Sequence, residues 1–353
     1  MSSRLRLRRG TVVSEDPLLV EVAGERRPAW ADEVLLGEMR EGDEVVVNVA
    51  AVELGLGSGG FDVVHVNLTR GLDGGAAGAE HVIKLNYTSL QHPVEPVEGT
   101  GELARDARGS FSTPGDRKEP RVAPPVLVLP LHGHLAPAAW AAAEASPGLR
   151  VGYVQAGGGA LPGSLSRDVA QLRECGLLCG HITAAPAYGG EYDALSTVGA
   201  FDAAGRLGWD AILAGPGPGI IGSETEFGHG GMAALDTAHA ALSLALPTIL
   251  SPRLSSSDPR ERHQALSHHT HTVLELLLAP VTIAAPATPE LERGGQALEE
   301  LRSSAPRHQL QESPVDLAAY EASGLPTTTM GRSLAEDPLF FAAPLAAGRL
   351  LAE

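Results

Sequence analysis

Short apolar runs separated by turns dominate the first ninety residues of the chain. Glycine, proline or acidic residues separate these runs, which are rich in β-branched side chains and typical of strands. The five predicted strands are Thr11–Val13, Leu18–Val22, Glu44–Val49, Asp62–Val66 and Ile83–Tyr87. Five short strands in so few residues predict a small all-β, barrel-like domain of the OB or SH3-like kind over residues 1–92.

The pattern of short apolar runs separated by turns disappears over residues 93–124. Prolines recur there among glycines, serines and charges of both signs, and no hydrophobic periodicity is present. A stretch of this length without periodicity is too long for a connection inside a compact domain. We therefore expect a linker over residues 93–124.

From residue 125 onward the chain alternates between buried-type strands, glycine-rich loops and helical stretches. The predicted strands are Val126–Leu131, Val151–Gln155, His181–Ala184, Ala211–Ala214, Thr248–Leu250 and Val281–Ala284. The predicted helices are Ala138–Ala145, Ser166–Cys175, Tyr192–Arg206, Ala233–Ala245 and Pro289–Ser303. Strands that alternate with helices form βαβ units and a parallel sheet. Residues 125–353 are thus predicted to be an α/β domain with a doubly wound, mostly parallel sheet and a C-terminal helical extension that packs back on the sheet.

Charge and composition narrow the range of partners. The chain has 43 acidic against 26 basic residues, a net charge of −17, which argues against a nucleic-acid partner. Its two cysteines cannot build a disulfide framework, and no apolar run approaches the length of a membrane span. We expect a cytoplasmic protein with no membrane partner. The sequence leaves its cofactor and its oligomeric state open.

A glycine-rich loop follows the fourth predicted strand of the α/β domain. Ligands of open parallel sheets bind beyond the carboxyl ends of the strands, where glycine lets the backbone approach an anion closely. The loop differs from phosphate loops that end in Gly-Lys-Ser/Thr and from the dinucleotide fingerprint. The predicted ligand-binding residues of this loop are Gly215, Gly217, Gly219, Gly222, Thr225 and Gly228. A rigid crossover that binds nothing is the alternative.

Histidines and arginines follow the fifth predicted strand. Asp258 before Pro259 predicts a helix start, with His263 in the first turn as an acid or base. We expect Asp258, Arg253 and His269 to contact the same anionic ligand. The alternative for these histidines is a purely structural role, and a metal centre built by this helix alone is not expected.

Arg332 lies in a loop near the C-terminus and is a further candidate for binding the anion. Its alternative role is a surface ion pair with Glu336 or Asp337.

His132 and His134 follow the first strand of the α/β domain at metal-ligand spacing. In an extended segment they project to one side, which makes His132 a candidate catalytic residue and the pair a candidate metal site. No carboxylate at fixed spacing completes a ligand shell. The sequence therefore predicts no metal.

Several motifs together resemble a known bacterial family. They are the segment from Ala51 to Gly60, the segment from Lys84 to Gln91, Gly215-Pro216-Gly217, Asp258-Pro259-Arg260-Glu261-Arg262-His263 with Ser267-His268-His269-Thr270, and Met330-Gly331-Arg332 with Glu336-Asp337-Pro338. They resemble domain of unknown function 3866, and the resemblance covers nearly the whole chain. It supports the architecture and implies no particular activity. His134 is not typical of that family.

Three functions remain open. The first is a small-molecule enzyme or binding protein with an anionic ligand at the strand ends, where hydrolysis or group transfer suits the residues better than redox chemistry. The second is a non-catalytic interaction protein that uses the N-terminal barrel. The third is a metal-dependent hydrolase built on His132 and His134.

Overall fold

The computed structural model describes residues 4–56, 59–72, 78, 80–99, 123–223, 225–289, 291–304 and 306–353. The chain divides into two compact units, Met1–Glu80 and His81–Glu353. None of the helices in the described ranges is long and apolar enough to cross a membrane.

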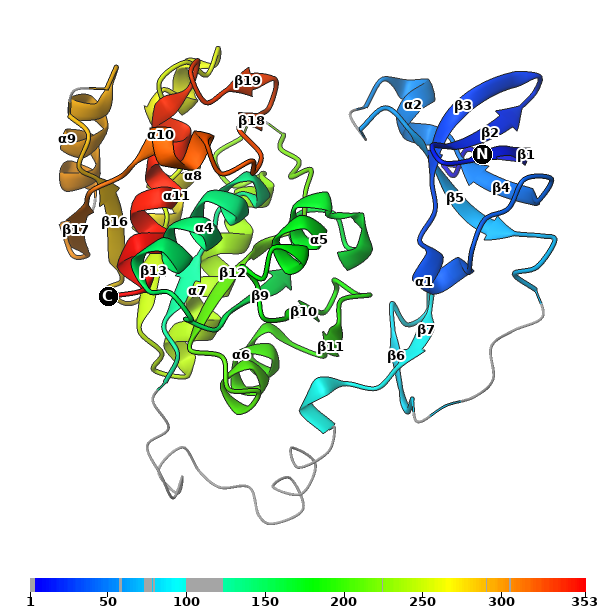
Figure 1. Ribbon diagram of the computed structural model, residues 1–353, viewed down its shortest axis with the longest axis horizontal. Helices are drawn as coiled ribbons and strands as arrows, with labels where there is room; N and C mark the ends of the chain where they lie inside the picture. The colour runs from blue at the N-terminus through cyan, green and yellow to red at the C-terminus, as the bar shows by residue number, and fades with distance from the viewer. Residues whose placement is uncertain are drawn as a thin grey trace. The chain divides into compact units, whose positions relative to one another are not determined.

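The first unit is a closed five-stranded barrel, as predicted (Figure 1). Its elements are β1 (Leu7–Glu15), β2 (Leu18–Val22), β3 (Glu25–Trp30), α1 (Glu33–Leu36), β4 (Glu44–Asn48), α2 (Ala50–Leu54) and β5 (Asp62–Asn67). The strands follow the order β1-β2-β3-β5-β4, and β4 closes the barrel on β1. Alternate valines, among them Val20, Val45 and Val47, fill its interior because successive side chains of a strand face opposite sides.

One predicted barrel strand belongs to the second unit instead. The run Ile83–Tyr87 forms only β6 (Val82–Lys84), which pairs with β7 (His92–Val94). Lys84 is buried, and its Nζ donates to Asp193 Oδ1 at 2.7 Å and to the Ala187 and Thr183 carbonyls. A buried ammonium needs such partners, and the α/β unit supplies them. The barrel unit therefore ends at residue 80 rather than at residue 92.

The start of the predicted linker is also ordered. Residues 93–99 complete β7, bridge Pro96 to Asp193 and form a short 3-10 turn over Val97–Gly99. Most of the predicted linker, residues 100–122, lies outside the described residues.

The second unit is a doubly wound α/β domain, as predicted (Figure 1). Its sheet consists of β8 (Val126–Val128), β9 (Val151–Ala156), β10 (His181–Ala184), β11 (Tyr192–Ala194), β12 (Ala211–Pro216), β13 (Thr248–Leu250), β16 (Thr282–Pro286) and β17 (Gln309–Ser313). All neighbouring strands are parallel, in the order β11-β10-β9-β12-β8-β13-β16-β17. The sheet thus has eight strands rather than the six predicted. The two additional strands, β11 and β17, lie at its edges.

Helices cover both faces of the sheet. They are α4 (Leu135–Ala145), α5 (Arg167–Glu174), α6 (Thr197–Arg206), α7 (Ala233–Ser243), α8 (His268–Leu276), α9 (Gly294–Ser304), α10 (Leu317–Glu321) and α11 (Pro338–Leu351). One apolar core lies among α4, α5 and α11, and a second lies among α6, α7, α8 and α9. The C-terminal helix α11 packs on the sheet beside α4, as expected. Gly348 allows the close approach, because a Cβ there would lie 2.1 Å from the Ala138 carbonyl oxygen.

Three predicted helices begin later than expected. The stretch Pro289–Ser303 becomes helical only at Gly294, where α9 starts. The first residues of the stretch Tyr192–Arg206 form β11, and α6 starts only after Ser196, whose hydroxyl accepts from Gly199 N. No helix begins at Pro259. Ala265–Leu266 (β15) instead pairs with Leu254–Ser255 (β14), and α8 starts at His268 with Ser267 as its N-cap.

Candidate functional site

The carboxyl ends of β12 and β13 lead into the segments that build the candidate site. After β12, two backbone hydrogen bonds fold the loop back on itself. The N–H of Ser223 donates to the Gly228 carbonyl, and the N–H of Gly230 donates to the Ile221 carbonyl. This brings His229 to the turn that precedes α7. After β13, Arg253 holds the start of α8 through its backbone: its N–H donates to Thr270 Oγ1, and its carbonyl accepts from Ser267 N.

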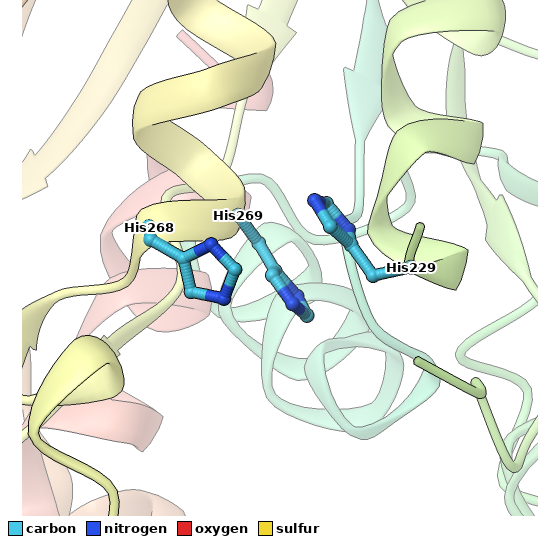
Figure 2. A group of neighbouring side chains, drawn as sticks. All are labelled: His229, His268 and His269. Atoms are coloured by element: carbon cyan, nitrogen blue, oxygen red, sulfur yellow. The ribbon is translucent and has the colours of Figure 1, made fainter. Parts of the chain in front are cut away.

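These contacts bring three imidazoles together (Figure 2). His268 and His269 come from the first turn of α8, and His229 faces them from the segment before α7. Each offers a ring nitrogen within 4.8 Å of the others, and they are the one group of potential metal ligands found in the described ranges. The rings of His229 and His269 are stacked, with centroids 3.6 Å apart.

The ring nitrogens of this group are poorly satisfied. Neither nitrogen of His229, nor Nε2 of His268, meets hydrogen-bond geometry with any described residue, although these atoms are buried. The Nε of Arg253 is also buried and also has no hydrogen-bond partner among the described residues. Such atoms are rare in folded proteins because each costs free energy. Several such atoms lie side by side in this group.

Burial keeps the imidazoles neutral. It lowers the pKa of His269 to about 2 and that of His263 to about 3, with Arg253 adding to both shifts. The pKa values of His229 and His268 are also lowered, chiefly by burial. A neutral imidazole is the form that binds a metal ion.

Glycine at position 231 keeps a space open beside two of the rings. A Cβ there would lie 3.0 Å from Nδ1 of His229 and 3.1 Å from Nδ1 of His269. Both nitrogens therefore border the same volume. A tetrahedral zinc ion needs its nitrogen ligands about 3.4 Å apart at bonds of about 2.1 Å. The stacked rings of His229 and His269 would therefore have to rotate out of their parallel arrangement before both could direct a lone pair at one ion.

A network of arginines and aspartates lies next to the histidines. Arg253 donates through Nη1 to His269 Nδ1 at 3.3 Å and through Nη2 to Asp258 Oδ2 at 3.3 Å. Asp258 also binds Arg260 at 2.9 Å and Arg332 at 3.4 Å. Burial alone would raise the pKa of Asp258, but the hydrogen bonds and charges of Arg260 and Arg253 outweigh it and hold that pKa well below its ordinary value.

The Nε of Arg332 forms an ion pair with Asp337 at 3.0 Å, which is one of the two pairings that the sequence offered as the alternative to anion binding. Arg332 also forms an ion pair with Asp258. With the histidines neutral, the charges of the three arginines are balanced by the carboxylates of Asp258, Asp337 and Glu336, the last of which also acts on Arg332.

The predicted ligand-binding residues therefore fall into two groups. Arg253, Asp258, His269 and Arg332 lie together, and the ring of His263 lies 4.8 Å from that of His269. The sequence predicted His263 in the first turn of a helix, but it lies in a short 3-10 turn over Glu261–His263. Its Nδ1 lies 2.7 Å from Ser267 Oγ.

The glycines of the loop after β12 have other roles. A Cβ at Gly215 or Gly217 would meet the Leu129 or Ala160 carbonyl oxygen within 2.7 Å, so these glycines serve close chain packing. Gly219 has a positive φ, and Gly228 donates its N–H to Thr225 Oγ1 within the loop. A Cβ at Gly222 would touch His229 at 3.5 Å, so Gly222 lies beside the histidine group.

His132 and His134 do not form the pair that the alternative of a metal site requires. They lie in a 3-10 turn rather than in an extended segment. His132 contacts Ser166 and Pro216, whereas His134 contacts Ser251 at 2.9 Å. Their imidazoles are therefore held by different partners.

Sequence reasoning missed His229 and His268 as site residues. His268 and His269 are adjacent in sequence, a spacing that does not predict a shared ligand on a helix. His229 lies about forty residues earlier, at the end of the glycine-rich loop. The one available signal was that this loop and the histidine-rich segment both follow strands of the same sheet.

Comparison with known proteins places the chain in a family. No curated protein and no solved structure matches it. A family model described as a protein of unknown function (DUF3866) matches residues 29–348, which include the last strands of the barrel and nearly all of the α/β unit. The chain belongs to the DUF3866 family.

Proposed function

We propose that the protein is a metal-dependent hydrolase that acts on a small anionic molecule at the carboxyl edge of its sheet. The observation that carries this proposal is the group of three neutral imidazoles, two buried and one partly exposed, in which both ring nitrogens of His229 and Nε2 of His268 lack a hydrogen-bond partner among the described residues. Three histidines and an open fourth position are a common ligand set of catalytic zinc. In such a site zinc lowers the pKa of bound water enough to make it a nucleophile at neutral pH.

The neighbouring arginine supports an anionic substrate. Arg253 is buried, and one of its N–H groups is directed to the nitrogen of His269 that borders the open space. If His269 bound a metal through this nitrogen, Nη1 of Arg253 would lose that partner while Nη2 stayed paired with Asp258. Nη1 could then donate to a carboxylate or phosphate oxygen, and the negative charge of that oxygen would offset the repulsion between Arg253 and the metal ion.

A pocket borders one member of the three-histidine group, His268, although His229, His269 and Arg253 are not in its lining. It measures about 430 Å³ and is lined by residues that include His268, Arg262 and Arg293. Volumes of 300–1,000 Å³ are typical of small-molecule sites. The free thiols of Cys175 and Cys179 agree with a reducing, cytoplasmic setting for this reaction.

Zinc titration of chelator-treated protein tests the proposal. We expect one equivalent to bind, to raise the melting temperature by mass action, and to strengthen the binding of inorganic phosphate. Gly231→Ala should lower zinc affinity, because its methyl group would crowd both Nδ1 atoms. Gly295→Ala is the matched control, since its nearest neighbour lies 4.0 Å away.

The controls decide between the alternatives. Equal zinc binding by Gly231→Ala and Gly295→Ala would contradict the placement of the metal. If neither zinc, cobalt nor manganese binds at stoichiometric levels, the metal-dependent reaction is excluded. If phosphate also fails to bind, the interaction protein that uses its barrel becomes the better account.

A further inference from the structure

A second pocket lies at the same edge of the sheet, at the start of α5. It measures about 220 Å³, and its lining includes Gly163, Ser166, Arg173, His181, Gly189 and Gly190. None of these residues contributes to the three-histidine group. The serine and the histidine make this pocket chemically distinctive.

Ser166 is paired with His132 in the geometry of a nucleophile and its base. The Oγ of Ser166 lies 2.7 Å from Nε2 of His132. The other ring nitrogen, Nδ1, lies 3.2 Å from the Pro216 carbonyl oxygen, which can only accept. Nδ1 therefore carries the proton, and Nε2 accepts the hydroxyl proton of Ser166. This is the arrangement that activates a serine.

The surroundings stabilise the charges that such a reaction develops. Burial lowers the pKa of His132, which keeps it neutral and ready to accept a proton. Asp168 Oδ2 lies 3.9 Å from His132 Nε2 and opposes that shift, so it would stabilise the imidazolium once formed. The N–H of Val169 donates to Ser166 Oγ at 3.1 Å and stabilises negative charge on that oxygen.

His181 supplies independent evidence that this pocket binds a ligand. The residue lines the pocket, is 5% exposed and stacks on Tyr153. Its Nε2 is buried and has no hydrogen-bond partner among the residues that the structure describes. A purely structural role for Ser166 as the N-cap of α5 does not account for this unsatisfied nitrogen in the lining of the same pocket.

We propose that Ser166 is the nucleophile of an acyl-transfer activity towards small carboxylic esters, with His132 as its general base. The Ser166 Oγ–carbon bond forms while the hydroxyl proton passes to His132 Nε2. The bond to the leaving alcohol then breaks, and that alcohol takes the proton from His132. Water hydrolyses the acyl-serine by the same route in reverse, and His132 again accepts and returns the proton. The pocket volume restricts the acyl group to a few heavy atoms, and His181 lies where it can hydrogen-bond the ester.

A fluorophosphonate probe tests this inference, with EDTA present so that the metal site plays no part. The Ser166 oxygen displaces fluoride from phosphorus, and the hydroxyl proton leaves through His132. We expect one equivalent of label on wild-type protein, located at Ser166 by peptide mass spectrometry. His132→Asn leaves the N-cap in place but should slow labelling by at least about 100-fold, the usual contribution of a general base.

Two serine variants separate reactivity from helix capping. Ser166→Ala should abolish labelling, whereas Ser196→Ala removes the equivalent N-cap of α6, a hydroxyl that accepts from Gly199 N at 2.9 Å, and should leave labelling unchanged. p-Nitrophenyl acetate should give a burst of one equivalent of nitrophenolate that Ser166→Ala lacks. Absence of label on wild-type Ser166, or equal labelling rates in wild type and His132→Asn, would show that Ser166 only caps the helix.

Discussion

Replacing His269 with Ala should lower the affinity of the protein for zinc by at least about 100-fold. Loss of residues that merely orient metal ligands typically costs 10–100-fold, and His269 would be a ligand itself. It stacks on His229 and shares the open space beside Gly231. Competition with a chromogenic zinc chelator measures the affinity, and circular dichroism reports whether the variant is folded.

A neighbouring histidine provides the control. His271 lies on the same helix but is exposed and pairs with Glu275 rather than with the three-histidine group. His271→Ala should bind zinc like the wild type. His268→Ala, at a partly exposed position, repeats the test if His269→Ala proves unstable. Equal affinity in all three variants would contradict the assignment of these ligands.

Replacing Asp258 with Ala should destabilise the α/β unit by about 3–5 kcal/mol, the usual cost of leaving a buried charge without its partner. Asp258 is fully buried and binds three arginines, of which Arg253 is itself buried. At 2–4 °C per kcal/mol, the melting temperature should fall by roughly 6–20 °C. Differential scanning calorimetry measures this change.

The pH dependence has a defined sign. Because the folded pKa of Asp258 is lowered, its stabilisation is present above the unfolded pKa of about 3.9 and is lost as the pH falls through the folded value. The melting temperatures of wild type and Asp258→Ala should therefore converge in acid. Glu312→Ala, which removes an exposed pair with Arg302, should cost less than about 1 kcal/mol. A similar loss in both variants would contradict the central role of Asp258.

In the α/β unit, the sequence predicted the strands whose side chains are mostly buried. The central strands β9 and β12 are buried along their length and almost wholly apolar, so composition alone identifies them. β3, β11 and β17 escaped notice because each carries polar or partly exposed residues, as strands with an open side do. Their pairing depends on neighbours distant in the chain.

The site was predicted less completely because long-range contacts override local signals. Asp258-Pro259 has the form of a helix start, but pairing of Ala265–Leu266 with Leu254–Ser255 keeps the chain extended until Ser267. That change moved His263 out of the expected helix. The arginine–aspartate network joins residues more than seventy positions apart, such as Asp258 and Arg332. The alternation of strands and helices predicted that polar loops gather at the carboxyl ends of the strands, but it could not show which side chains meet there.

X-ray absorption spectroscopy of the zinc-loaded protein tests the central claim most directly. If His229, His268 and His269 bind the ion, the spectrum should show about three imidazole nitrogens at 2.0–2.1 Å, with the multiple-scattering pattern of histidine rings. His269→Ala loaded with one equivalent of zinc should lose part of that pattern, while His271→Ala should retain all of it. A first shell of oxygen alone, or a histidine pattern unchanged in His269→Ala, would contradict the account.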